Sequence, residues 1–156
     1  MKNTITALRN AGLVVMPIQV SKKPTLTGWA KPTFSYEVED HKENHKHLGI
    51  ITGKASGGLE VIDVDSKILK PELVNAFKSN FIELLMTFDV EQELSIYETM
   101  SGGLHVLYRC ENYAGNMKIC HAKDGTTKDP NSKEALLETR GQGGYVVKYD
   151  NHIAGY

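Results

Sequence analysis

The chain has 156 residues, which is enough for one domain with a core of its own and short for two. Its formal net charge of −1 and its 40% hydrophobic and 24% charged residues are those of an ordinary globular protein, so any basic surface must be local. Two cysteines cannot build a disulfide framework, and nothing resembles a signal peptide or a membrane span, so we expect a cytoplasmic protein without a membrane partner.

Hydrophobic periodicity and turn residues predict many short strands and few helices. The expected elements in chain order are a helix over 4–10, a strand over 13–20, a loop over 21–34, strands over 48–52 and 59–65, a helix beginning at Pro71, a hairpin of strands over 93–99 and 104–110, and a strand pair over 135–140 and 144–149. We expect residues 111–134 to be irregular. This pattern indicates an α+β fold, in which helices pack on a mixed or antiparallel sheet.

Helical spacing after Pro71 predicts one apolar face, and its expected members are Val74, Phe77, Phe81, Leu84 and Leu85. Proline suits the first turn of a helix because the missing N–H group would have no partner there. We therefore expect this helix to be the one that covers the sheet.

The strand over 59–65 begins with apolar residues and ends with two aspartates, Asp63 and Asp65. Residues two apart on a strand share a face, so Ile62 and Val64 are expected to face the core and the aspartates the other side. At about 6 Å and an effective dielectric near 20, the two carboxylates repel by roughly 2–3 kcal/mol. A solvated strand end explains the pair, and so does a site for a hard divalent cation such as Mg²⁺ or Mn²⁺.

Glycines and a histidine follow the first strand of the predicted hairpin. Gly102 and Gly103 have no side chains, so a phosphate could approach their backbone beside an imidazole donor at His105. An ordinary Gly-Gly turn with an incidental exposed histidine is the alternative.

A third strand end carries Glu138 and Arg140, again two residues apart and again before a glycine-rich turn. A solvated Glu/Arg pair is the alternative here. If the three strand ends converge, carboxylates could hold cations while His105 and Arg140 neutralise phosphate oxygens. The sequence then predicts a site for metal ions and a triphosphate.

Five segments in order resemble one known family. They are GLVVMPI, KKPTLTGW, HLGIITGKASGGLEVIDVD, ETMSGGLHVLY and ETRGQGGYVVKYDNHIAGY. On these segments the chain resembles the bifunctional DNA primase/polymerase (prim-pol) N-terminal domain of the archaeo-eukaryotic primase superfamily, over nearly its whole length.

The resemblance implies the fold and the site. The implied fold is an RRM-like α+β core with an N-terminal αβ unit beside it. Asp63, Asp65 and Glu138 are the implied ligands of two Mg²⁺ or Mn²⁺ ions, and His105 contacts the phosphates of a nucleoside triphosphate. Ser101, Lys23 and Arg140 are further implied nucleotide contacts. Glu138 stands where the family usually has aspartate, and Gln142 stands where it often has an acid.

The resemblance also implies a context. We expect residues 1–156 to form a single prim-pol domain, excised from the N-terminus of a larger replication protein. The expected activity is metal-dependent nucleotidyl transfer that makes primers on a DNA template, with extension of primers as a second expected activity. The expected partners are template and primer DNA, nucleoside triphosphates and a helicase domain in the same protein or operon. The expected setting is the cytoplasm of a prokaryote, with a phage, plasmid or other mobile element.

Two alternatives stay open at this stage. The chain could be a catalytically inactive module that binds nucleotides or DNA, or a metal-dependent nuclease in which the same carboxylates activate water. Cys110, Cys120 and His121 fall short of a standard four-ligand zinc site, and we interpret the cysteines as reduced thiols that are structural or incidental.

Overall fold

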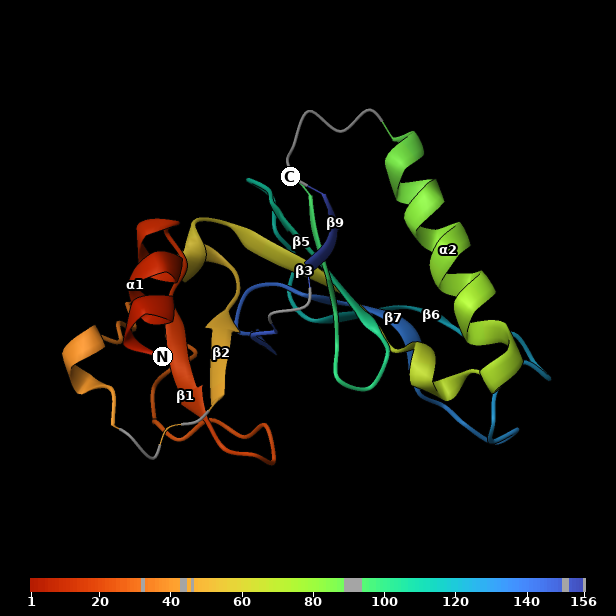
Figure 1. The fold of residues 1–156 in the computed structure, drawn as a ribbon, viewed down its shortest axis with the longest axis horizontal. Helices are drawn as coiled ribbons and strands as arrows, with labels where there is room; N and C mark the ends of the chain where they lie inside the picture. The colour runs from red at the N-terminus through yellow and green to blue at the C-terminus, as the bar shows by residue number, and fades with distance from the viewer. Residues whose placement is uncertain (32, 43–44, 46, 89–93, 150–151, 156) are drawn as a thin grey trace. The chain divides into compact units, whose positions relative to one another are not determined.

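The computed structural model describes residues 1–31, 33–42, 45, 47–88, 94–149 and 152–155, the last four as backbone. The fold is α+β, as the sequence predicts. Its helices and strands are α1 (Lys2–Asn10), β1 (Val15–Ile18), β2 (His47–Ile51), β3 (Leu59–Val64), α2 (Pro71–Thr87), β4 (Ser95–Glu98), β5 (Leu104–Arg109), β6 (Met117–His121), β7 (Ala135–Arg140), β8 (Tyr145–Val147) and β9 (His152–Gly155) (Figure 1). Short 3-10 turns are η1 (Val38–Asp40), η2 (Lys54–Ser56) and η3 (Ser66–Ile68). In the part of the chain that is described, neither helix has the length and apolar character needed to cross a membrane.

The chain divides into two compact units. The first comprises Met1–Val61, Arg109–Asn116 and Arg140–Lys148, and the second comprises Ile62–Tyr108, Met117–Thr139 and Tyr149–Tyr156. Strands β3, β5 and β7 each run from one unit into the other.

The first unit contains a three-stranded antiparallel sheet of order β1-β2-β8. Buried Met16, Ile18 and Ile51 form its core. Trp29 packs edge-on against Tyr145 beside this core, with ring centroids 4.9 Å apart. Trp29 thereby anchors the loop after β1, because an aromatic side chain buries more apolar surface than other side chains do.

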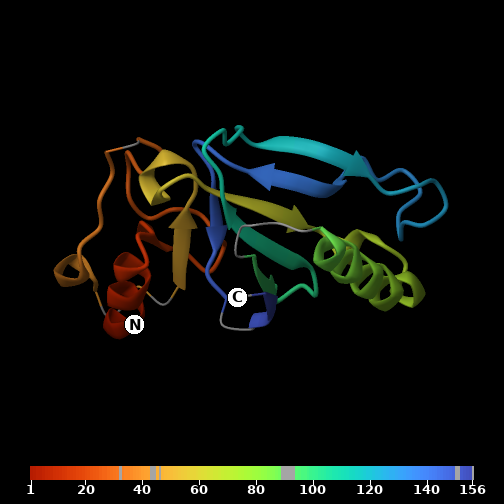
Figure 2. The same cartoon turned by 90° about the horizontal axis from the view of Figure 1, so that it is seen from above.

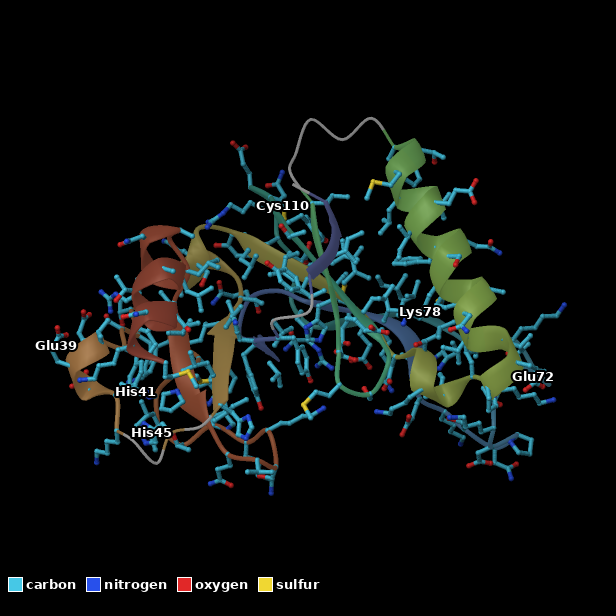
Figure 3. The ribbon with its side chains drawn as sticks, in the orientation of Figure 1. Glu39, His41, His45, Glu72, Lys78 and Cys110 are labelled. Atoms are coloured by element: carbon cyan, nitrogen blue, oxygen red, sulfur yellow. The ribbon has the colours of Figure 1, made fainter. Side chains whose placement is uncertain are left out.

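A buried tyrosine organises the polar segment that follows. The hydroxyl of Tyr36 lies 3.2 Å from Nδ1 of His41 and 3.2 Å from Nδ1 of His45, and Figure 3 shows both histidines near Glu39. Burial, and then the charge of Asp40, raise the pKa of the Tyr36 phenol. The histidines therefore serve as hydrogen-bond partners of a buried hydroxyl.

The second unit holds most of a six-stranded antiparallel sheet of order β6-β7-β3-β5-β4-β9. Within it, β3, α2 and the β4–β5 hairpin, together with β7, form a split β-α-β arrangement of the RRM-like type. The complete β-α-β-β-α-β motif has a second helix before its last strand. Here strand β6 stands in the place of that helix and pairs with β7, and the two strands lie side by side in Figure 2. Strand β3 lies between β7 and β5, so its side chains have neighbours on both flanks.

Helix α2 covers one face of this sheet. Pro71 occupies its first turn, as predicted, and Phe77 and Phe81 stack with ring centroids 6.0 Å apart. The buried residues of the cluster are Val64, Ile96, Leu104 and Val106, and the partly buried ones packed against it include Ile62, Phe77, Phe81 and Leu85. Figure 3 shows Lys78 on the sheet side of α2 and Glu72 on the other side. Ile62 and Val64 therefore face the core as predicted, whereas Leu84 is 52% exposed and lies off the packed face.

The predicted pairing of 135–140 with 144–149 is wrong. Strand β7 pairs with β6 and β3, whereas β8 pairs with β2 in the other sheet. The glycine-rich segment between them turns without closing a hairpin: the Gln142 amide donates to the carbonyl of Ala114, and a Cβ on Gly141 would lie 1.8 Å from that oxygen. After this turn the chain continues from β7 in one sheet to β8 in the other.

Strand β6 lies in the segment that was expected to be irregular. It is an edge strand, and its two large apolar side chains, Met117 and Ile119, are 53% and 51% exposed. An edge strand with both faces partly in solvent lacks the alternation that identifies a half-buried strand.

The β4–β5 turn generates a stability prediction. A Cβ on Gly103 would lie 2.2 Å from the carbonyl oxygen of Val64, whereas the space around Gly102, with φ +81°, is open. We expect Gly103→Ala to lower the free energy of unfolding by about 3 kcal/mol or more, because backbone would have to move. Gly102→Ala should cost only the left-handed backbone strain of about 1 kcal/mol.

Urea denaturation followed by circular dichroism measures both variants. Equal costs for the two substitutions would contradict the close approach of Gly103 to β3.

Candidate functional site

Asp63 lies on the central strand β3, on the sheet face opposite α2, because its neighbours Ile62 and Val64 pack toward the helix. Its Oδ1 is 3.6 Å from Nε2 of His105 on the neighbouring strand β5. The Asp63 side chain is 26% exposed and that of His105 is 9% exposed. The structure therefore brings together two of the predicted site residues, one acid open to solvent and one imidazole held below the surface.

The imidazole of His105 is placed by aromatic neighbours. Its ring centroid lies 5.4 Å from that of Tyr149, with the planes tilted by 50°, and Tyr97 is its direct partner in the β4–β5 ladder. Nε2 is the ring nitrogen that faces the Asp63 carboxylate. The ring of His105 is thus held with Nε2 toward the acid on the neighbouring strand.

Glu138 lies on β7, the strand on the other flank of β3. The Asp65 amide donates to the carbonyl of Leu136 at 2.9 Å, which fixes the antiparallel register of the two strands. Counting back from Asp65 to Asp63 and forward from Leu136 to Glu138 places those two acids directly opposite each other. Opposite residues of an antiparallel pair share a face. Asp63 and Glu138 are therefore cross-strand neighbours.

The row continues to the edge of the sheet, where Lys118 on β6 is the direct partner of Glu138. Across four adjacent strands the side chains run Lys118, Glu138, Asp63 and His105. We call these four residues the transverse row. They are far apart in sequence, and the strand order alone makes them neighbours.

Asp65 stands just past the end of β3, where the chain turns into η3. Its Oδ2 accepts a salt bridge from Nζ of Lys67 at 2.9 Å, and the two side chains are 30% and 50% exposed. The hydrogen bond to Asp65 raises the pKa of Lys67 most, and the charges of Asp65, Glu134 and Asp63 raise it further. Lys67 is a site residue that sequence reasoning missed; its place two residues after Asp65 was the available signal.

The turn that precedes β5 uses its own amides. The Gly102 amide donates to the carbonyl of Thr99 at 2.9 Å, and the Gly103 amide donates to Oγ1 of Thr99 at 3.0 Å. Phosphate binding at these two amides, which the sequence suggested, would have to break both bonds. Ser101 is exposed, with Oγ 3.2 Å from Oγ1 of Thr99, so its hydroxyl can donate to an anion at this turn.

Lys23 and Arg140 belong to the first unit, whereas Asp63, Asp65 and Glu138 belong to the second. Lys23 is exposed in the loop after β1, and Arg140 is the last residue of β7.

Another acid on β3, Glu60, has a structural role in the first unit. It is 6% exposed, and its Oε1 accepts the amide of Ala114 at 3.1 Å. Its Oε2 lies 3.6 Å from Sγ of Cys110, and burial followed by the charge of Glu60 raises the pKa of that thiol. Cys120 and His121 belong to the second unit, where Nδ1 of His121 lies 3.1 Å from the carbonyl oxygen of Glu134.

The chemistry of the acidic residues fits Mg²⁺ or Mn²⁺. Among the described residues, no group of three or more His, Cys, Asp or Glu side chains is placed to hold a metal ion. Mg²⁺, however, is usually bound by one or two carboxylates together with substrate phosphates and waters. The partly exposed carboxylates of Asp63 and Asp65, with the ammonium of Lys67 already on Asp65, supply this kind of donor set.

Comparison with known families assigns the chain to one of them. The sequence model of the family described as "Bifunctional DNA primase/polymerase, N-terminal" matches residues 5–154. No curated protein and no solved structure matches the chain. The match covers nearly the whole chain and confirms the family resemblance of the sequence segments.

The register of β3 and β7 can be tested by crosslinking. In a chain whose native Cys110 and Cys120 are replaced by serine, we expect Asp63→Cys plus Glu138→Cys to form a disulfide under mild oxidation. Cα atoms of a hydrogen-bonded antiparallel pair lie about 5.5 Å apart, which a disulfide can span. Non-reducing electrophoresis and mass spectrometry detect the bond.

The control is Asp63→Cys plus Leu137→Cys, because Leu137 packs into the core on the α2 side. Crosslinking of the control pair with equal yield would contradict the register.

Proposed function

Because the chain belongs to the bifunctional DNA primase/polymerase N-terminal family, we propose that it is a metal-dependent nucleotidyltransferase that makes primers and extends them on a DNA template. The observation that carries the proposal is the transverse row, in which an imidazole and two carboxylates from three adjacent strands share one sheet face. Carboxylates beside a hydrogen-bond donor are the groups that phosphoryl transfer needs, because the chemistry consists of positioning and charge stabilisation.

In this proposal Asp63, Asp65 and Glu138 would hold the two ions together with phosphate oxygens of the nucleotide and with waters. The ions would supply activation of the 3′-hydroxyl of the primer and stabilisation of charge on the leaving pyrophosphate. His105 donates from Nε2 to an oxygen of the triphosphate, and its burial beside Tyr149 keeps the ring in one orientation. A fixed donor of this kind costs no reorganisation when charge develops on the phosphate.

Ser101, Lys23 and Arg140 are proposed as further contacts to the nucleotide. A hydroxyl, an ammonium and a guanidinium are the common ligands of phosphate oxygens. The proposed partners are template and primer DNA, nucleoside triphosphates and a helicase domain in the same protein or operon. The proposed setting is the cytoplasm of a prokaryotic host, in replication of a phage, plasmid or other mobile element.

A primer assay tests the function. Purified protein is incubated with single-stranded DNA, labelled nucleotides and Mn²⁺, and products are resolved on a denaturing gel. We expect primers from the wild type, and at least about a 100-fold loss in Asp63→Asn plus Asp65→Asn, because neutral amides hold hard divalent cations less well than carboxylates do and the charge stabilisation that the cations supply is lost. DNA binding and the circular dichroism spectrum of the variant serve as controls for folding.

The alternatives predict different results from the same protein. A wild type that binds DNA without making or extending primers would support the inactive binding module. Degradation of labelled DNA with metal and without nucleotides would support the nuclease.

Glu138 allows a sharper test of the third carboxylate. We expect Glu138→Gln to lower primer extension by about 100-fold, whereas Glu138→Asp keeps activity within about tenfold, because a carboxylate one methylene shorter still ligates a hard cation. Steady-state extension rates at saturating Mn²⁺ measure both. If both variants lose activity equally, the carboxylate charge of Glu138 is not what matters.

A further inference from the structure

Lys67 is held in place by the residues around it. It belongs to η3, the turn directly after β3, and its neighbours Ser66, Ile68 and Leu69 are 0%, 7% and 4% exposed. Ser66 donates from Oγ to the carbonyl of Gly102 at 2.8 Å, which ties the turn to the loop before β5. The backbone is therefore fixed on both sides of Lys67, while its side chain is half exposed.

Lys67 forms its ion pair with a proposed metal ligand. Its Nζ is 2.9 Å from Oδ2 of Asp65, which the proposed function takes as a ligand of a divalent cation. Lys67 thus supplies a single positive charge at the acidic end of β3, where a divalent cation would supply two.

We propose that Lys67 is an internal counter-ion, which neutralises Asp65 until a divalent cation displaces it and which then binds phosphate oxygens of the nucleotide. This inference rests on the proposed function, since it takes Asp65 as a metal ligand. A divalent cation on Asp65 repels the ammonium, because like charges a few ångströms apart raise each other's free energy. The released side chain has a flexible four-carbon stem and three donors, which suit the phosphates that arrive with the metal.

The proposal predicts opposite effects of Lys67 on two affinities, that for the metal ion and that for the nucleoside triphosphate. Without nucleotide, Lys67 competes with the cation and weakens metal binding. With nucleotide, the same side chain strengthens binding of the triphosphate. A lysine that only stabilised the turn would change neither affinity in this pattern.

The test measures Mn²⁺ binding by electron paramagnetic resonance on the full chain at low ionic strength. Without nucleotide, we expect Lys67→Met to bind Mn²⁺ about two- to tenfold more tightly than wild type, as suits a half-exposed ion pair. Lys67→Arg keeps the charge and should stay within about twofold of wild type. Lys133→Met, which removes an exposed lysine of the same unit, is the matched control and should also stay within about twofold.

The second readout is binding of a non-hydrolysable nucleoside triphosphate analogue with Mn²⁺, measured by calorimetry. We expect Lys67→Met to weaken it about threefold or more, since one charged phosphate contact is lost. Unchanged or weaker Mn²⁺ binding by Lys67→Met would overturn the counter-ion role. Unchanged nucleotide binding would overturn the second role.

A metal-free measurement separates this inference from the proposed function. In excess chelator, Lys67→Met should lower the Tm of the wild type and leave the Tm of Asp65→Asn unchanged, because the neutral amide needs no counter-ion. Absence of this coupling overturns the inference even if the wild type makes primers. Coupling in a chain that binds no Mn²⁺ overturns the proposed metal site and the displacement step, and leaves only the ion pair.

Discussion

The structure of the second unit depends on how it compensates the carboxylates at the end of its central strand. Asp63 and Asp65 lie two residues apart at the end of β3, and the repulsion between their carboxylates opposes the strand end that carries them. Each acid lies beside a different nitrogen group. The ammonium of Lys67 is 2.9 Å from the carboxylate of Asp65, and the imidazole of His105 is 3.6 Å from the carboxylate of Asp63. The first partner comes from the next turn and the second from the neighbouring strand, so local and long-range structure both serve the same electrostatic need.

The strand order explains why the compensated carboxylate of Asp63 lies in the candidate site. A central strand has a neighbour on each flank, so a polar residue on its open face is joined by one side chain from β5 and one from β7. The opposite face is committed to α2 through Val64 and its cluster. Because strand residues alternate between faces, burying Val64 forces Asp63 outward. The same alternation therefore buries Val64 in the core and exposes Asp63 on the opposite face.

Local patterns in the sequence predicted much of this arrangement. The α2 helix, the β4–β5 hairpin and the outward face of Asp63 follow from periodicities that neighbouring residues carry themselves. The strands that pair with β7 could not be predicted in this way. Strand pairing depends on contacts between distant residues, such as that of Gln142 with Ala114, and no local pattern encodes them. Lys67 was missed for a related reason: its contact depends on the direction in which η3 leaves the strand, and a lysine in a turn has no periodic signature.

The transverse row shows where a cation would act most strongly. From the edge inward it runs from the base Lys118 to the acids Glu138 and Asp63 and then to the imidazole of His105. Within this row, the two acids face each other across adjacent strands, and like charges directly opposite in a sheet destabilise it. Lys118 and His105 stand on the outer sides of these acids, so neither lies between them. A divalent cation bound between β7 and β3 would turn that repulsion into attraction, and the sheet already presents the carboxylates that it needs.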